Sequence, residues 1–510
     1  MLKFKLNPLA AACAAVLGLS AGQALAALNA FDAPDVDIYL SGASGPQNLL
    51  GSVANKLFDA GQGIFVFQDD GGTPANFADD GKSYRAYYGV VKNDPSIKAS
   101  LVGKKVLLIN RAKGGSAFGV IPVAKAQAIA TLQVSNATCV LNTGIYRCPE
   151  IGNDLAVNAS NRVPDFGVSD VEPNMFKGPI NVEFGQSQLT AAESAVFNGT
   201  QFGASSLMMG IVATDGVPAT LAISKADYRG MLSGTLQDWG SVGNGSTTGA
   251  VAVCRRVQGS GTQASYNWYF NNFPCAKNGL NGSNGTTTPA RMSDSAGYNG
   301  AHAGTSADPI LIDPSAGYTV VENPSSGNVR DCLARAQSGA DHTFTGDDGK
   351  VYKVQFSKAP GTKAMGVLSL DSLGQENGWS FRALDGAGRI VPLAGGVGTF
   401  SCTNSNQLEC GIAPTKANHR EGIYEFAVEL SFQYRNAAVN GVSALAGLKK
   451  DVADQFVKFI GDPDVLNTLS SPGAKEATIA LPINFDPTTN TNVSKATHFG
   501  NTCAPLQKQL

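Results

Sequence analysis

Charged side chains are scarce in this chain: Asp, Glu, Lys and Arg make up 15% of its 510 residues, and the formal net charge is −2. A general attraction to nucleic acid or to an anionic membrane surface is therefore not expected. Beyond residue 26, no run of about 18 consecutive apolar residues occurs, which is the length that spans a bilayer. We therefore expect the mature chain to be soluble.

Residues that build catalytic and metal sites are also sparse. The chain has four scattered histidines: His302, His342, His419 and His498. No Cys-x-x-Cys pair accompanies them, so no metal or other cofactor is predicted, and each histidine is expected at the surface. No Ser-His-Asp spacing or nucleophile elbow supports an enzyme. The acidic pairs Asp69-Asp70 and Asp79-Asp80 lie in a Gly-rich stretch and are interpreted as solvated turns.

Residues 1–26 have the pattern of an export signal. Two lysines precede an apolar run from Leu9 to Leu19, and Ala24-Leu25-Ala26 is a typical cleavage site. The run is too short to span a bilayer, so we expect cleavage near Ala26 and a periplasmic or secreted protein. Cys13 follows three alanines, which is a poor lipidation signal.

Without Cys13, the chain keeps an even number of cysteines, and in an exported protein this favours disulfides. They are Cys139, Cys148, Cys254, Cys275, Cys332, Cys402, Cys410 and Cys503. The short spacings predict local Cys139–Cys148 and Cys402–Cys410 links. The other four permit three pairings. Of these, one containing Cys254–Cys275 is preferred, because that link would brace the turn described next.

The stretch Arg256-Val257-Gln258-Gly259-Ser260-Gly261-Thr262 follows an apolar run, Ala250–Val253, and precedes a segment of helical character, Gln263–Phe270. A strand, a glycine-rich turn and a helix start bring backbone N–H groups to one point, where the helix N-terminus carries partial positive charge. Ser260 and Thr262 add hydroxyl donors, and Arg256 adds a planar cation. The pattern indicates an oxyanion site, although an ordinary capped helix after a glycine turn has the same local sequence.

The same order of strand, small-residue turn and helix occurs twice earlier in the chain. The first comprises Asp37–Leu40, Ser41–Pro46 and Gln47–Asp59; the second comprises Lys104–Asn110, Gly114-Gly115-Ser116 and Val120–Thr131. A further short apolar segment, Asp165-Phe166-Gly167-Val168-Ser169-Asp170, ends in an acid. Alternating strands and helices predict an α/β fold, in which ligands bind at the carboxyl ends of strands.

These motifs resemble the periplasmic phosphate-binding proteins that serve bacterial phosphate ABC importers and have the two-lobed type II periplasmic binding protein fold. The R-x-x-G-S-G-T motif of that family stands at Arg256–Thr262, and its D-F-G-A-S-D motif at Asp165–Asp170. Its two small-residue turns are similar to Ser41–Gly45 and Gly114–Ser116. The markers follow the order of the family over most of residues 35–485.

The resemblance implies a role for each matching residue. Arg256 would contact phosphate, and Ser44, Ser116, Ser260, Gly261 and Thr262 would donate hydrogen bonds. Asp170 would accept the hydrogen of a protonated phosphate, which sulfate does not carry. Gln258 departs from the Asp that often stands there, and extra material falls at about 60–105, 132–162, 276–350 and 385–420. Arg255 is expected to point away from Arg256 along the strand and to leave binding unaffected.

The expected architecture has lobe I at 28–214 and 427–510 and lobe II at 215–426, with chain crossings near Ile211–Leu221 and Tyr424–Phe432. The expected function is capture of phosphate, or a related tetrahedral oxyanion, by a monomer that delivers it to an ABC importer. The long polar insertions keep a second hypothesis open, a secreted or surface protein for adhesion, matrix or sequestration. A hydrolase such as a phosphatase is the third hypothesis.

Overall fold

The computed structural model describes residues 28–45, 47–71, 83–154, 158–182, 186–243, 245, 247–276, 288–393, 396–404, 407–483 and 485–509. The predicted export segment 1–26, including Cys13, and the acidic pair Asp79-Asp80 lie outside these residues. Within the described residues, no helix has the length and apolar character needed to cross a membrane.

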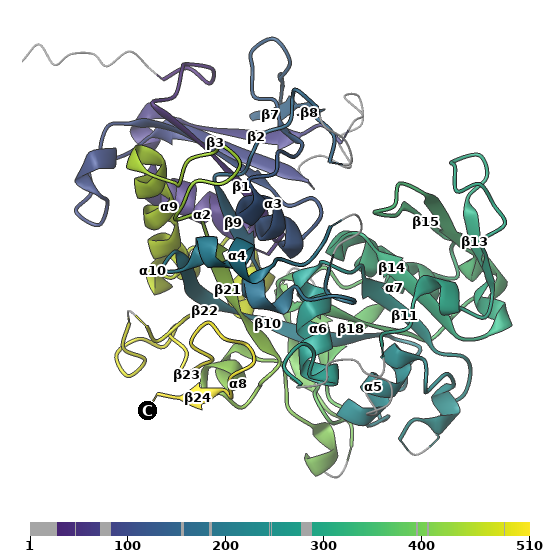
Figure 1. Cartoon of the computed structure of the whole chain (residues 1–510). Coiled ribbons are helices and arrows are strands. Elements are labelled where there is room, and N and C mark those ends of the chain that lie inside the picture. The colour runs from purple at the N-terminus through teal and green to yellow at the C-terminus, as the bar shows by residue number, and fades with distance from the viewer. Residues whose placement is uncertain are drawn as a thin grey trace, which may run out of the picture.

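Two α/β lobes share one long strand, β10 (Gln201–Thr214) (Figure 1). The first half of β10 pairs with β21 (Ala427–Gln433), and its second half pairs with β17 (Ala364–Ser369) and β18 (Trp379–Arg382). From Ala204 onward every residue of β10 is buried, as expected for a strand covered on both faces. Backbone hydrogen bonding is therefore continuous from one lobe to the other through β10.

Lobe I contains the strands on the β21 side of β10, in the order β21-β9-β1-β4-β3-β2-β7-β6. The strands are β1 (Val36–Gly42), β2 (Ile64–Asp69), β3 (Tyr84–Val90), β4 (Lys105–Arg111), β6 (Val140–Asn142), β7 (Ile145–Cys148) and β9 (Phe166–Ser169), with β5 (Thr131–Leu132) and β8 (Glu150–Ile151) as a separate pair. The helices are α2 (Gln47–Leu57), α3 (Ile121–Lys125), α4 (Ala191–Ser194), α9 (Gly447–Ile460) and α10 (Pro463–Asn467). Since β1 runs parallel to β4 and β9, the carboxyl ends of all three strands meet at one edge.

Lobe II has a parallel centre in which β11 lies between β14 and β17. Its strands are β11 (Ala252–Arg256), β14 (Thr319–Asn323), β19 (Arg389–Leu393) and β20 (Gly396–Ser401), in addition to β17 and β18. Its helices are α5 (Lys225–Ser233), α6 (Gly261–Asn271) and α7 (Ser326–Ser338), whereas α8 (Lys416–Arg420) contacts β22 (Thr478–Ala480). A second sheet of β12 (Tyr298–Asn299), β13 (Ile310–Ile312), β16 (Val351–Val354) and β15 (His342–Thr345) projects from this lobe (Figure 1).

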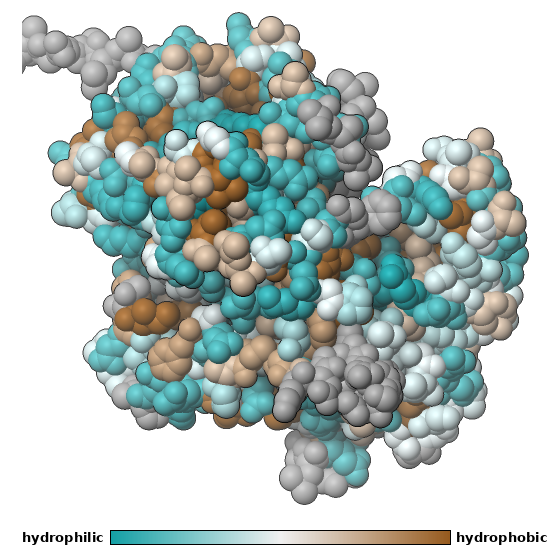
Figure 2. Space-filling view, in the orientation of Figure 1, coloured by the Kyte–Doolittle hydropathy of each residue, from teal (hydrophilic) through white to brown (hydrophobic). Residues whose placement is uncertain are grey.

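The end of the chain returns to the shared strand. Helix α11 (Pro472–Ala477) leads into β22 (Thr478–Ala480), which pairs with the first half of β10. The small β23 (Ala496–Thr497) and β24 (Gln507–Lys508) pair lies below lobe I, beside α8 (Figure 1). The main apolar core extends through both lobes, and a second cluster, which includes Tyr39 and Phe67, covers the other face of the lobe I sheet. Hydrophilic and hydrophobic residues are mixed over the face shown in Figure 2.

One predicted helix is shorter than the sequence pattern indicated. The segment Val120–Thr131 was expected to be helical, but α3 ends at Lys125. Ala126 has φ of 50°, in the left-handed region, and its N–H closes the helix on the carbonyl groups of Pro122 and Val123. The remaining residues extend towards β5, so their apolar character reflects a buried strand pair rather than a helix face.

Two of the predicted disulfides are confirmed, Cys139–Cys148 and Cys402–Cys410. The preferred Cys254–Cys275 link is wrong, because Cys254 is bonded to Cys332 and Cys275 to Cys503. Cys254 lies inside β11 and faces α7, which carries Cys332 and packs on β11. Helix α6 rises about 16 Å along its eleven residues, which carries Cys275 away from that strand.

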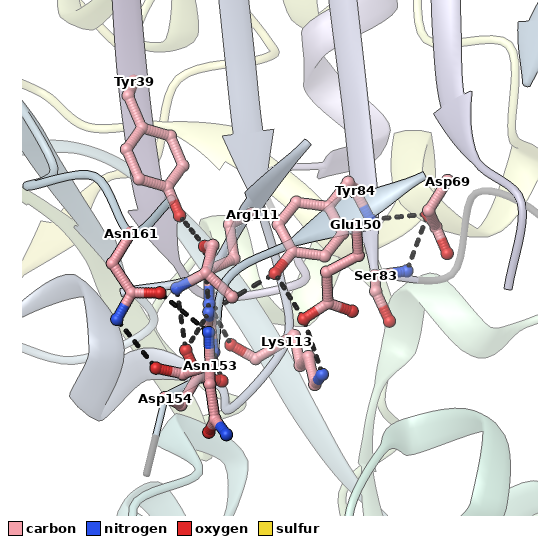
Figure 3. Close-up of polar contacts among 11 residues, drawn as sticks. Tyr39, Asp69, Ser83, Tyr84, Arg111, Lys113, Glu150, Asn153, Asp154 and Asn161 are labelled. Atoms are coloured by element: carbon pink, nitrogen blue, oxygen red, sulfur yellow. Dashed lines mark hydrogen bonds and ion pairs between the residues drawn. The ribbon is translucent and has the colours of Figure 1, made fainter. Parts of the chain in front are cut away.

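The expectation of surface histidines is wrong for three of the four. His342, His419 and His498 are buried, and burial lowers the pKa of His342 and of His419 to about 4. Asp69 is also not a solvated turn, because it is 4% exposed and accepts hydrogen bonds from the backbone N–H groups of Ser83 and Tyr84 (Figure 3). Burial raises the pKa of Asp69 to about 6.

Candidate functional site

The polar turns singled out in the sequence lie at the carboxyl ends of buried strands. In lobe I, Ser44 follows β1, Ser116 follows β4 and Asp170 follows β9. In lobe II, the segment Ser260–Thr262 follows β11 and begins α6. Each strand is buried along most of its length, and these polar residues follow its carboxyl end.

The three lobe I segments pack against one another through glycine. A Cβ atom on Gly42 would lie 1.8 Å from the carbonyl oxygen of Val168, and one on Gly119 would lie 2.1 Å from the same oxygen. A Cβ atom on Gly167 would lie 1.6 Å from the carbonyl oxygen of Gly119. Backbone atoms cannot give way here without separating the strands. The glycines therefore bring the turn with Ser116 directly against the segment that ends in Asp170.

The two lobes touch at these turns. The N–H of Ala117 in lobe I donates to the carbonyl of Gly259 in lobe II at 2.9 Å. A Cβ atom on Gly261 would lie 2.3 Å from the Ser116 hydroxyl and 2.6 Å from the Asp170 Cβ. Only glycine fits in this space, so the N-terminus of α6 reaches the lobe I turns. The structure thus brings together Ser116, Asp170 and Gly261, which lie in separate parts of the sequence.

Asp170 is the buried acid of this contact, with 5% of its surface exposed. Its backbone N–H donates to the Ser116 hydroxyl at 3.2 Å, while its Oδ1 has no hydrogen-bond partner among the described residues. Burial raises the pKa of Asp170 to about 6, against the attraction of Arg256. At neutral pH this carboxylate is mostly charged and holds a buried acceptor oxygen that suits a hydrogen donated by a ligand.

Arg256, the last residue of β11, is likewise buried, with 5% of its surface exposed. Its guanidinium donates to the carbonyl groups of Asn323 and Pro324 at 3.3 and 2.9 Å and to the Ser326 hydroxyl at 3.1 Å. These three partners are neutral, and the Arg256 charge also attracts the Asp170 carboxylate. Its Nη2 also lies 3.6 Å from the Cβ position of Gly115 in lobe I. The positive charge is therefore placed at the contact between the lobes.

The N-terminus of α6 adds hydrogen-bond donors beside this arginine. Ser260 is the N-cap, and its hydroxyl accepts from the N–H of Gln263 at 3.4 Å, which leaves its own hydrogen available to donate. Gly261 and Thr262 are buried in the first turn, where backbone N–H groups and the helix dipole favour an anion. Arg256, Ser260, Gly261 and Thr262 therefore occupy one corner of lobe II.

Ser44 is less closely associated with this cluster than the other candidates. It is half-buried, and its carbonyl accepts from the N–H of Gln47 at the start of α2. The next residue, Gly45, is near Asp170, because a Cβ on Gly45 would lie 3.2 Å from Asp170 Oδ1. The β1–α2 turn therefore borders the acid, with Ser44 one residue away from the contact.

A buried polar network holds the turn that carries Ser116 (Figure 3). Arg111, at the end of β4, donates to both carboxylate oxygens of Asp154 at 2.7 and 2.8 Å. Its Nε donates to the carbonyl of Lys113 at 3.1 Å, and its guanidinium lies 4.6 Å from the Phe118 ring centre. Arg111 thus contacts the chain on both sides of Ser116 and fixes the backbone of the turn.

Two charged residues near the candidate site, Arg330 and Asp371, were not identified from the sequence. Arg330 lies one turn into α7 and donates to the Ser372 hydroxyl at 3.1 Å. Burial lowers the pKa of Arg330, against the attraction of Asp371, and the same Asp371 contributes to the raised pKa of Asp170. The sequence did contain a signal, since Pro324-Ser325-Ser326-Gly327 is another small-residue turn between a strand and a helix.

The side chain of the neighbouring Arg255 contacts different partners from those of Arg256. Its side chain is 3% exposed and binds Glu322, and its Nε donates to the carbonyl of Ala290 at 3.0 Å. Its removal would leave Glu322 without this buried counter-charge. Arg255 therefore stabilises lobe II, and its replacement would alter folding as well as any binding.

The arrangement can bind an anion. In the described part of the chain, no group of three or more His, Cys, Asp or Glu side chains could hold a metal ion. A cation, a helix N-terminus and hydroxyl donors surround a buried carboxylate acceptor. Such a set suits an oxyanion that carries at least one hydrogen.

No protein-family model matches the sequence, and no curated protein is similar to it. Among solved structures, the chain is similar to one described as a phosphate ABC transporter substrate-binding protein with bound phosphate from Clostridium perfringens, with 10% identity, a TM-score of 0.40, and coverage of 86% of this chain and 98% of that one.

Two further structures are similar at the same level. They are an ABC-type phosphate transport receptor from Vibrio cholerae, with 11% identity, a TM-score of 0.35 and coverage of 82% and 93%, and PstS from Borrelia burgdorferi, with 11% identity, a TM-score of 0.32 and coverage of 85% and 97%. These proteins are of the kind that the sequence motifs resemble. At TM-scores below 0.5 the similarities carry no argument about this chain, whose architecture follows from its own strand pairing.

Proposed function

We propose that this chain is an exported binding protein that holds phosphate, or a related tetrahedral oxyanion, between its two lobes. One observation carries the proposal: the buried Asp170 carboxylate and the buried Arg256 guanidinium lie at the interlobe contact, beside the N-terminus of α6. Cation and helix donors would bind the charged oxygens, while Asp170 would accept a hydrogen from the ligand.

The acceptor gives the site a means of selection. Monohydrogen phosphate can donate its hydrogen to Asp170, whereas sulfate would place an oxygen acceptor against a carboxylate acceptor. Ser116, Ser260, Gly261 and Thr262 would donate to the remaining oxygens, and Ser44 would border them. The proposed lobes are 28–214 with 427–510 and 215–426, with the ligand drawing them together as a hinge closes.

Under this proposal the protein is not an enzyme and serves an ABC importer from the periplasm as a monomer. Isothermal titration of the mature protein with phosphate, sulfate and molybdate tests the ligand. We expect phosphate to bind and sulfate to be rejected, and Asp170→Asn, whose amide can donate a hydrogen, to admit sulfate. Binding of none of the three anions to folded protein would contradict the proposal.

A further inference from the structure

Residues 494–505 near the end of the chain, which we call the C-terminal strap, are bound to lobe I beside the candidate site. The N–H of Thr502 donates to Glu172 at 2.8 Å, and its hydroxyl donates to the second oxygen of the same carboxylate. Glu172 and Thr502 are both buried. Since Glu172 lies two residues after Asp170, the strap is attached to the lobe I segment that carries the buried acid.

A second carboxylate fixes the strap to β21. Glu429 accepts from the Thr497 hydroxyl and from the N–H of His498, both at 2.6 Å, and from the N–H of Gly500 at 2.7 Å. Glu429 is 5% exposed, so these three bonds are shielded from solvent. The strap is therefore part of the lobe I surface over most of its length.

The strap residue that follows Thr502 is bonded covalently to lobe II. Cys503 forms a disulfide with Cys275, which follows the end of α6 in lobe II. Trp268 of α6 also contacts the His498 ring edge to face, with 5.4 Å between ring centres. Thr502 and Cys503 thus connect Glu172 in lobe I to α6 in lobe II through adjacent residues.

Helix α6 is consequently tied to lobe I at both ends. At its N-terminus, Gly261 lies against Ser116 and Asp170. In its middle, the Asn267 amide donates to Asn181 of lobe I at 2.6 Å, and both residues are buried. At its C-terminal end, the covalent link through Cys275 closes a ring that also contains the candidate site.

We infer that the Cys275–Cys503 disulfide makes the C-terminal strap a third covalent connection between the lobes, in addition to the two proposed chain crossings, and limits their opening so that a bound oxyanion leaves slowly. The kinetic part rests on the proposed function. Opening the lobes would move α6 away from Asp170, and the disulfide would then pull Thr502 from Glu172. Release therefore requires either a small opening or detachment of the strap.

Among the four disulfides of the described residues, this one alone joins the proposed lobes, and its Cys503 is exposed. Cys254–Cys332 is buried inside lobe II, and Cys402–Cys410 closes a local loop. The local link supplies a matched control, because its removal also deletes one disulfide but leaves the lobes connected as before.

The release test uses protein loaded with radiolabelled inorganic phosphate and chased with an excess of unlabelled phosphate. For Cys275→Ser with Cys503→Ser we expect release to be faster than in the wild type by about tenfold or more, because the open state becomes more populated. Cys402→Ser with Cys410→Ser should release at the wild-type rate. An unchanged release rate in the first variant, with phosphate binding retained, would overturn the inference.

A second variant covers the case in which loss of the disulfide prevents folding, as judged by circular dichroism. An insertion of about four Gly and Ser residues between Thr502 and Cys503 keeps the disulfide but lengthens the link between Glu172 and α6. We expect the same faster release. Wild-type release from this folded variant would also overturn the inference.

Small-angle X-ray scattering of the ligand-free protein tests the restraint on lobe opening independently of the proposed phosphate binding. We expect both strap variants to have a larger radius of gyration than the wild type and the control pair. If the wild type binds no phosphate but the variants still expand, the proposed function fails and the restraint stands. Identical scattering of all four proteins would refute the restraint, whatever the anion measurements give.

Discussion

Two arginines, Arg111 and Arg256, end strands in the two lobes with a similar local sequence but have different partners. Arg111 ends β4 and Arg256 ends β11, and in each case a glycine follows at the third position and begins a turn with a serine. Arg111 meets the Asp154 carboxylate inside lobe I, whereas Arg256 binds carbonyl and hydroxyl groups at the lobe contact. The hydrogen-bond partners, and not the sequence motif, therefore distinguish the structural Arg111 from Arg256, the candidate ligand-binding arginine.

The partner of Arg111 comes from far along the chain. Asp154 lies in the loop-rich insertion 132–162, where it also accepts from the N–H of Ala130. A neutralised guanidinium has little charge left to offer an anion, and it instead sets the shape of the Ser116 turn. The two lobes thus contribute different properties: lobe I gives a rigid acceptor and hydroxyl, and lobe II gives the positive charge.

Arg111→Ala should destabilise the fold of lobe I, where Arg111 has a structural role. The Asp154 carboxylate would lose its buried bidentate partner, and we expect the free energy of unfolding to fall by about 3–5 kcal/mol, measured by urea denaturation. The control is Lys113→Ala, whose exposed pair with Glu150 should contribute less than about 1 kcal/mol. Equal stability of the two variants would mean that Arg111 does not hold the turn.

Arg256→Ala should weaken the proposed anion binding at the contact between the lobes. Loss of charge-assisted hydrogen bonds to the ligand, worth roughly 1.5–3 kcal/mol each, predicts phosphate affinity lower by about a hundredfold or more in isothermal titration. Arg389→Ala is a suitable control, because Arg389 lies at the surface of lobe II in a pair with Asp215. Arg255 cannot serve, since it holds Glu322. Wild-type affinity of Arg256→Ala would place the anion elsewhere.

Asp170→Asn tests the burial of the lobe I carboxyl through the pH dependence of the free energy of unfolding. The pKa of Asp170 is raised to about 6 by burial, whereas an unfolded Asp titrates near about 3.9. Between these values the folded state binds more protons than the unfolded state, so wild-type stability falls as pH rises.

The amide has no such loss, so ligand-free Asp170→Asn should be more stable than the wild type at pH about 8, by roughly 1–3 kcal/mol. The difference should shrink as the pH falls and approach zero below pH about 3, where the wild-type carboxyl is protonated in both states. Urea denaturation at several pH values checks this. A variant that is less stable than the wild type at the higher pH would show that the charged carboxylate is favourably paired.

Gly261→Ala should test how closely the two sides meet. Its added methyl group would collide with Ser116 and Asp170, and the lobes would have to separate slightly. We expect phosphate affinity to fall by about tenfold, with a small change in stability. Gly396→Ala is the control, because a Cβ there meets nothing within 4 Å. Equal affinities of both variants would mean that the lobes need not touch to bind the ligand.

Local patterns in the sequence predicted the elements and the turns at which they end. The α2 and α6 helices and the strand β1 lie where the sequence pattern placed them, whereas β11 begins two residues later than the predicted apolar run Ala250–Val253. The same patterns could not show which segments meet. The Cys275–Cys503 link joins residues 228 apart, and the roles of Arg111 and Arg330 depend on Asp154 and on the α7 turn.

Within the site, the sequence motifs identified the residues that come together, Ser116, Asp170, Arg256 and Ser260–Thr262, but not their burial. Nothing near Asp170 in the sequence indicates that its carboxylate is enclosed, because Gly45 lies beside Oδ1 and Gly261 of lobe II lies beside Oδ2. The buried His498 has the same origin, since its ring packs against Trp268 of α6, which is distant in the chain.

The glycines Gly42, Gly119 and Gly167 restrict how this protein could evolve a new ligand preference. Their neighbours are backbone atoms at less than 2.2 Å from any added Cβ, so the lobe I turns have no adjustable side-chain layer behind them. Stepwise substitution beneath Ser116 or Asp170 would separate the strands before it altered the geometry of these groups. Divergence towards another ligand is therefore open mainly to lobe II, where α7 and the turn before it contribute exchangeable side chains around Arg256.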